Sequence, residues 1–184
     1  DGFLLVTTAD SDGVPVTYTA PRPALVLPGQ TARVRLYVRP GQTGGEFLVR
    51  LIAAEGKLRA ESTFYADEGE GARVVPPALP AIDRLVVACG PQVGLSKSVQ
   101  LSSGIGGTAL TAVAQLDDPG HLPLDWYGYE GVETVILATS QAEPYRALTA
   151  DSERIAALTR WVELGGHLVI FCGREAPEFL GPQG

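Results

Sequence analysis

The stretch Arg84-Leu85-Val86-Val87-Ala88-Cys89 is short and almost continuously apolar. A second stretch of the same kind is Glu133-Thr134-Val135-Ile136-Leu137-Ala138. Strands without polar alternation are typical of parallel sheets, because such sheets are buried on both faces. The two stretches therefore predict a parallel α/β domain in the second half of the chain.

The sequence around these two stretches also has the pattern of a parallel α/β domain. The expected elements are strands over 109–116 and 167–172, a short helix and turn over 122–131, and a helix that starts near residue 149. Asp151 or Ser152 can cap this helix, and Gly165-Gly166 ends it. Right-handed crossovers between such elements give a doubly wound sheet.

The first 75 residues have the pattern of an antiparallel β-sandwich, because strand-like stretches alternate with turn signals about every 8 to 14 residues. The expected strands are residues 3–8, 14–20, 24–27, 32–38, 46–54 and 59–66. In one of them, Val34, Leu36 and Val38 alternate with polar or basic neighbours, namely Arg33, Arg35, Tyr37 and Arg39. One face of this stretch is expected to lie in the core and the other in water.

A linker separates the two halves in this interpretation. Acidic residues and glycines at 67–71 resist packing, and Pro76, Pro77 and Pro80 enforce an extended backbone. The expected organisation is a β-sandwich domain over 1–75, a Pro-rich linker over 76–82, and an α/β domain over 83–184.

Composition limits the classes of function. The 184 residues are 45% hydrophobic and 19% charged, which argues against a disordered chain. The net charge of −7 disfavours binding to nucleic acid. No apolar run approaches the roughly 20 residues that span a bilayer. Because the chain starts at Asp1 without an initiator Met or a secretory signal, we expect a truncated part of a longer protein, with sequence missing on both sides.

The stretches WYGYEGVETVIL (126–137), LTRWVELGG (158–166) and HLVIFC (167–172) form one recognisable pattern. Together they resemble the class I glutamine amidotransferase-like superfamily, in the divergent form found in large bacterial envelope proteins. The resemblance covers about residues 83–173. It implies a flavodoxin-like strand order of 2-1-3-4, an appended N-terminal β-sandwich, and an extracytoplasmic location in the periplasm or cell envelope.

In this superfamily a nucleophilic Cys follows such a strand at a sharp turn, with a Gly two residues to either side. Cys172 falls at this place, but Ile170 and Arg174 stand where the glycines would be. A His and an acidic residue are expected downstream, whereas the chain has only His121 and His167. His167 precedes Cys172 by five residues on the same strand, roughly 16 Å away. Cys172 is therefore a weak catalytic candidate.

Four other residues are candidates for a site. Cys89 ends the first parallel strand, at the edge where open α/β sheets bind ligands, although a buried structural thiol explains either cysteine. Trp126, Tyr127 and Tyr129 can stack on a sugar or a partner, but aromatic residues before a buried strand also cover cores.

Two further motifs have structural explanations. The segment 104–108 has the glycines of a phosphate-binding loop, but it lies about 14 residues after the first strand and lacks Gly-Lys-Ser/Thr, so we expect a helix stop. Asp10-Ser11-Asp12-Gly13 has oxygen ligands for calcium but lacks a third ligand and the distant Glu, so we expect a hairpin turn. No metal and no cofactor is predicted.

The strand order decides whether the two cysteines can bond. In the order 2-1-3-4 one strand separates Cys89 from Cys172, so they lie roughly 10 Å apart and beyond disulfide reach. In the alternative order 3-2-1-4 they lie on neighbouring strands. We expect the first order and two free thiols, both moderately protected in the native state.

Two hypotheses of function follow. The first is a non-catalytic extracytoplasmic module for binding or assembly within a larger bacterial envelope protein, with a protein or the rest of its own chain as partner. The second is a cysteine-dependent hydrolase or amidotransferase whose remaining catalytic residues lie beyond Gly184. The bulky neighbours of Cys172 and the lack of a downstream His favour the first, so we expect no enzyme activity.

Overall fold

The computed structural model describes residues 1–25, 29–67, 69–91, 109–141, 145, 148 and 151–172. The chain divides into two compact units, Asp1–Pro80 and Ala81–Gly184. This division falls inside the segment 76–82, which the prolines mark as a linker. The segment 104–108 lies outside the described residues.

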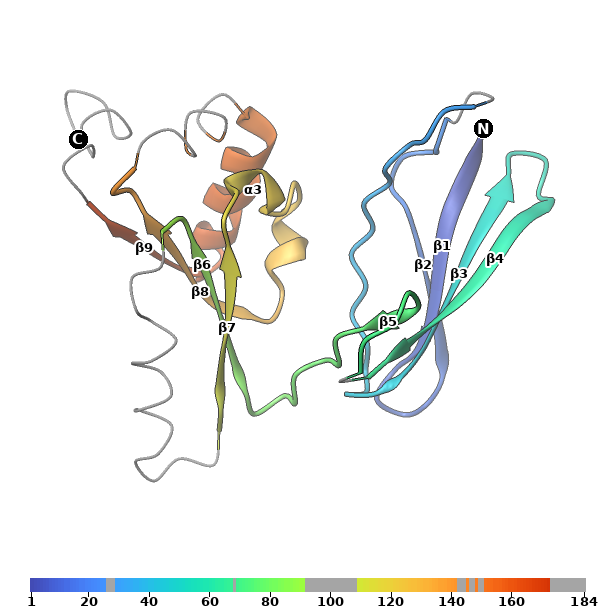
Figure 1. The fold of residues 1–184 in the computed structure, drawn as a ribbon, viewed down its shortest axis with the longest axis horizontal. Helices are drawn as coiled ribbons and strands as arrows, with labels where there is room; N and C mark the ends of the chain where they lie inside the picture. The colour runs from blue at the N-terminus through green and yellow to red at the C-terminus, as the bar shows by residue number, and fades with distance from the viewer. Residues whose placement is uncertain are drawn as a thin grey trace. The chain divides into compact units, whose positions relative to one another are not determined.

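Unit 1 contains one five-stranded sheet with the order β2-β1-β3-β4-β5 (Figure 1). The strands are β1 (Gly2–Ala9), β2 (Pro15–Thr19), β3 (Gly45–Ala53), β4 (Leu58–Ala66) and β5 (Val74–Val75). All neighbours pair antiparallel except β4 and β5, which are parallel. The stretches predicted at 3–8, 14–20, 46–54 and 59–66 match the first four strands. The described residues form one sheet here, which corrects the expectation of two packed sheets.

The predicted strand over 32–38 is wrong. Residues 26 and 27 of the stretch predicted at 24–27 lie outside the described residues. Ala24 makes only an isolated bridge with Gly2. Residues 32–38 join no strand ladder, although Val34, Leu36 and Val38 are half-buried as their alternation predicted. The alternation of apolar and polar residues predicts which side chains are buried. A strand also needs a neighbouring strand to form hydrogen bonds with, and the local sequence does not reveal whether one is present.

The turn between β1 and β2 is the hairpin that the sequence predicts. The carboxylate of Asp10 accepts hydrogen bonds from the backbone N–H groups of Asp12 (2.9 Å) and Val14 (2.8 Å). Gly13 adopts a φ of 80°, which glycine tolerates without a Cβ penalty. Both features explain the Asp-Ser-Asp-Gly motif as a turn.

The described residues of unit 2 form a four-stranded, fully parallel sheet with the order β7-β6-β8-β9 (Figure 1). Numbered along this unit, the order is 2-1-3-4. The strands are β6 (Arg84–Cys89), β7 (Thr111–Leu116), β8 (Val132–Ala138) and β9 (His167–Phe171), close to the four predicted stretches. Two short 3-10 helices, η1 (Pro119–His121) and η2 (Trp126–Tyr129), lie between β7 and β8.

Helix α3 (Ser152–Glu163) begins and ends at the signals present in the sequence. The side chain of Asp151 accepts a hydrogen bond from the N–H of Arg154 at 3.1 Å, which caps the first turn. At the other end Gly165 has a φ of 104°, and the N–H of Gly166 donates to the carbonyl of Trp161 at 3.0 Å. This pair of glycines forms a Schellman motif.

The core of unit 2 lies between α3, the 3-10 helices and one face of the sheet. Its buried members are Cys89, Leu122, Tyr129, Val135, Leu137, Tyr145, Leu148, Ala157, Leu158 and Trp161. Burying a large apolar side chain of this kind stabilises the fold by about 1.5–3 kcal/mol. Across the described ranges, no helix combines the length and the apolar character needed to cross a bilayer.

The division into two units predicts the course of limited proteolysis. A broad-specificity protease should cut first between residues 67 and 81, where most side chains are exposed, and should leave two stable pieces. Mass spectrometry of the first fragments checks this. A first cut inside β6, β8 or α3 would contradict the division.

Candidate functional site

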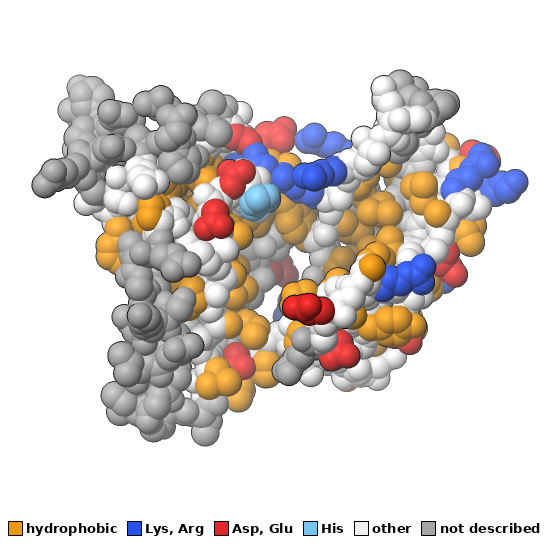
Figure 2. All heavy atoms as spheres, viewed as in Figure 1, with side chains coloured by type: hydrophobic (Ala, Val, Ile, Leu, Met, Phe, Trp, Pro, Cys, Tyr) orange, Lys and Arg blue, Asp and Glu red, His pale blue; other side chains and the backbone are white. Residues whose placement is uncertain are grey.

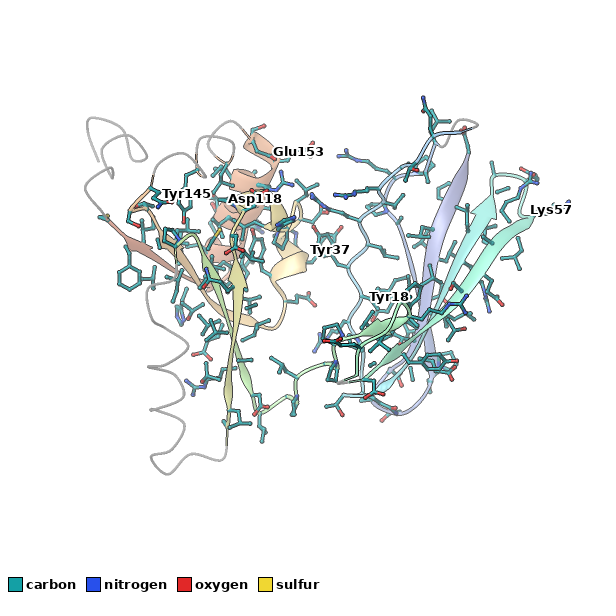
Figure 3. The ribbon with its side chains drawn as sticks, in the orientation of Figure 1. Tyr18, Tyr37, Lys57, Asp118, Tyr145 and Glu153 are labelled. Atoms are coloured by element: carbon teal, nitrogen blue, oxygen red, sulfur yellow. The ribbon has the colours of Figure 1, made fainter. Side chains whose placement is uncertain are left out.

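The carboxyl ends of the parallel strands in unit 2 meet at one edge of the sheet, where open α/β sheets usually bind ligands. Cys89 ends β6 and Ala138 ends β8, and these two strands are neighbours. The hydroxyl of Tyr145 donates to the carbonyl of Cys89 at 2.7 Å and to that of Ala138 at 3.1 Å (Figure 3). Tyr145 thus occupies the space directly beyond the ends of β6 and β8. These are the two strands between which the strand order of the sheet switches from one side to the other.

The backbone at this edge is fitted closely around the tyrosine. Gly90 has a φ of 96°, and a Cβ there would lie 2.5 Å from the Tyr145 hydroxyl and 2.7 Å from the Ala138 carbonyl. The side-chain amide of Gln115 donates to the Gly90 carbonyl at 2.6 Å. A larger residue at Gly90 would displace the tyrosine, so the glycine serves close packing here.

The thiol of Cys89 lies in an environment that keeps it protonated. Its side chain is 1% exposed and belongs to the core of unit 2. Burial raises the pKa of Cys89 to about 11, and the negative charge of Asp118 acts in the same direction. Burial likewise raises the pKa of Tyr145, so its hydroxyl remains a donor at neutral pH. Reactive cysteines need the opposite, an exposed thiol with a lowered pKa.

Cys172 lies just after β9 and is exposed, as a free thiol. Its sulfur is 3.9 Å from the carbonyl of Ile170. His167 begins the same strand, so it lies at the opposite end of β9 from the thiol. Cys89 is also free, as predicted, but the exposure of Cys172 corrects the expectation that both thiols are protected.

The structure separates the three aromatic candidates. Tyr129 is 1% exposed and stacks on Trp161 with ring centroids 5.3 Å apart, so it covers the core. Trp126 is 42% exposed and Tyr127 is 36% exposed, and their rings meet edge to face at 5.8 Å. Only Trp126 and Tyr127 therefore present a ring to an external ligand.

Trp126 also lines a shallow hollow of about 360 Å³ at the amino ends of β8 and β9. Its wall is formed by Trp126, Tyr129, Glu130, Gly131, Val132, Glu133, Trp161, Leu164, Gly165, Gly166 and His167. Glu133 is already paired with Arg84 at 3.3 Å. The hollow lies at the opposite end of the strands from Cys89, so the aromatic and cysteine candidates do not form one site.

Tyr145, Gln115 and Arg154 are the residues that the sequence reasoning did not identify. Arg154 pairs with Asp151 and donates to the carbonyls of Leu122 (3.1 Å) and Gly120 (2.7 Å), which ties α3 to the loop after β7. Each of these three side chains donates to backbone carbonyls of residues that are distant from it in sequence. Local pattern gives no signal for such partners.

Two further searches, one for metal-ligating side chains and one for similar proteins, identify no reaction for this edge. In the part of the chain that the structure describes, no three His, Cys, Asp or Glu side chains cluster closely enough to hold a metal ion. Comparison with known proteins finds no matching family model, no matching curated protein and no matching solved structure.

The two hydrogen bonds of Tyr145 predict its contribution to stability. Tyr145→Phe leaves two buried carbonyls without their donor and should lower the free energy of unfolding of unit 2 by about 1–3 kcal/mol. Urea unfolding followed by tryptophan emission measures this, because both tryptophans lie in unit 2. Tyr65→Phe, at an exposed position in unit 1, is the control and should have no effect. A loss below about 0.5 kcal/mol for Tyr145→Phe would contradict the role.

Proposed function

We propose that this chain is a non-catalytic module for binding or assembly, in which unit 2 is a degenerate class I glutamine amidotransferase-like domain. The proposal places it outside the cytoplasm, in the periplasm or cell envelope of a bacterium, as part of a larger protein. Its partner is another protein or the rest of its own chain. The parallel order β7-β6-β8-β9 supports the flavodoxin-like assignment of unit 2.

The observation that carries the non-catalytic proposal is the Tyr145 hydroxyl between the ends of β6 and β8. A ligand in the usual crevice of an open α/β sheet would have to displace this buried ring and break both of its hydrogen bonds. Burial raises the pKa of the thiol next to it, Cys89, to about 11, which favours the protonated form at neutral pH. The filled space and the raised pKa of Cys89 both support a site without cysteine-dependent catalysis at this position.

A second candidate function is favoured by one observation, the exposure of Cys172 at the carboxyl end of β9. An exposed cysteine at this edge has the access that a nucleophile of an amidotransferase needs. Activation would require a base close to the thiol, and β9 places His167 at its far end. The non-catalytic proposal is therefore better supported.

Glutamine hydrolysis separates the two functions. The full-length parent protein should release no ammonia from glutamine above the uncatalysed rate, and its Cys89→Ala and Cys172→Ala variants should behave identically. Iodoacetamide at about pH 8 should label Cys172 in the native state and Cys89 only after unfolding, because alkylation needs an accessible thiolate. Ammonia release that is lost in Cys172→Ala would overturn the proposal in favour of the hydrolase.

A further inference from the structure

Strand β9 lies at one end of the sheet in unit 2, where β8 is its only strand partner among the described residues (Figure 1). The carbonyl of Phe171 accepts a hydrogen bond from the N–H of Thr139 at 3.0 Å, so this carbonyl points to the side of β8. The backbone groups of successive residues in a strand point to opposite sides. The N–H and C=O groups of Leu168 and Ile170 therefore point away from β8, to the outer edge of the sheet.

The outer edge of β9 is open. Within the described ranges, no backbone group bonds to the outward N–H and C=O groups of Leu168 and Ile170. The sulfur of Cys172 lies 3.9 Å from the Ile170 carbonyl, which is a weak contact. Val169 and Phe171 remain 40% and 46% exposed, and hydrophobic side chains are visible at the surface of unit 2 in Figure 2. The edge thus offers hydrogen-bonding groups and apolar surface to another strand.

The other sheet edges are protected against pairing with another chain. In unit 1, β2 begins at Pro15 and β5 is only two residues long. In unit 2, β7 has no exposed residue. By contrast, β9 contains no Lys, Arg, Asp, Glu or Pro, and its ladder with β8 has no bulge. Natural proteins protect sheet edges with charges, prolines, bulges or short strands, so β9 is the unprotected edge among the described strands.

We infer that β9 is a dimer interface, at which the same strand of a second copy pairs antiparallel and joins the two sheets into one. A two-fold axis through Val169 relates the copies, so that Leu168 of each copy lies opposite Ile170 of the other. The inference goes beyond the proposed function, because self-association does not depend on whether the chain is catalytic.

Hydrogen bonding selects this register. Two antiparallel strands exchange hydrogen bonds between opposite residues whose N–H and C=O groups both face the partner. In β9 these residues are Leu168 and Ile170, and an axis at Val169 places each opposite the other. All five residues of β9 then overlap with the strand of the copy. An axis at Leu168 or at Ile170 would leave two residues of each strand beyond the end of the other.

The facing side chains favour a second copy as the partner. In this register Val169 lies opposite Val169 of the copy, and Phe171 lies opposite His167. No like charges therefore face each other in the new ladder. Because the axis is perpendicular to the sheet, Val169 and Phe171 of both copies lie on one face and gain apolar neighbours. A charged strand would instead have to bury its charges against these side chains.

A charge swap at Val169 tests the inference. The wild-type chain should sediment as a dimer at about 100 µM, with twice the mass of one chain. Val169→Lys and Val169→Glu each place like charges opposite one another on the axis and remove an apolar contact, so each should weaken dimerisation by about tenfold or more. An equimolar mixture of the two variants should form a dimer again, because opposite charges then face each other.

Val14→Lys and Val14→Glu, at an exposed valine of unit 1, are the matched controls and should dimerise as the wild type does. Val169 is already partly exposed in the single chain, so its substitution should leave the fold intact. Circular dichroism checks this.

Cross-linking locates the two-fold axis. Opposite residues in a non-hydrogen-bonded antiparallel pair have Cα atoms about 4.5 Å apart, which a disulfide can bridge. Val169→Cys in a Cys172→Ser chain should therefore give a covalent dimer on a non-reducing gel after mild oxidation with diamide. The wild-type chain is the control and should give none, because its two Cys172 residues would lie about 20 Å apart across the axis.

A monomeric wild-type chain at about 100 µM, wild-type dimerisation of either Val169 variant alone, or no dimer in their mixture would overturn the inference. A dimeric 184-residue chain together with a monomeric full-length parent would also overturn it, because another part of the parent would then cover the edge. None of these results involves Cys89 or glutamine hydrolysis, so a failure here is distinguishable from a failure of the non-catalytic proposal.

Discussion

The hydrogen bonds from the Tyr145 hydroxyl to the carbonyls of Cys89 and Ala138 hold together the carboxyl edge of the sheet in unit 2. They satisfy two carbonyls at the ends of adjacent parallel strands, and they require Gly90 to have no side chain. A buried hydroxyl bound in this way is costly to displace. The crevice that most open α/β sheets offer to a ligand is therefore filled by the chain's own core.

The strands of unit 2 were predictable because burial on both faces leaves a local signature. The apolar runs at 84–89 and 133–138 can be identified as strands from their own residues, without knowing which strands lie beside them. The helix was equally predictable, since Asp151 and Gly165 signal its two ends. The segment 32–38 has an equally clear pattern and yet joins no ladder, because pairing depends on a partner that local sequence does not encode.

The candidate site was predictable only in outline. The position of Cys89 follows from the end of its strand. The raised pKa of its thiol follows from burial and from the negative charge of Asp118, which lies far away in sequence. The aromatic candidates show the same limit. Tyr129 and Trp126 are three residues apart, and only the stacking of Tyr129 on Trp161 decides which of them covers the core.

The protonation state of Cys89 tests the non-catalytic account most directly. In a Cys172→Ser chain with carbon-13 label at the cysteine Cβ, the chemical shift of Cys89 can be followed from about pH 6 to about pH 11. The account predicts a thiol shift through neutral pH, with a change only as the pH approaches about 11. A titration midpoint below about pH 7.5 would reveal an activated thiolate and contradict the account.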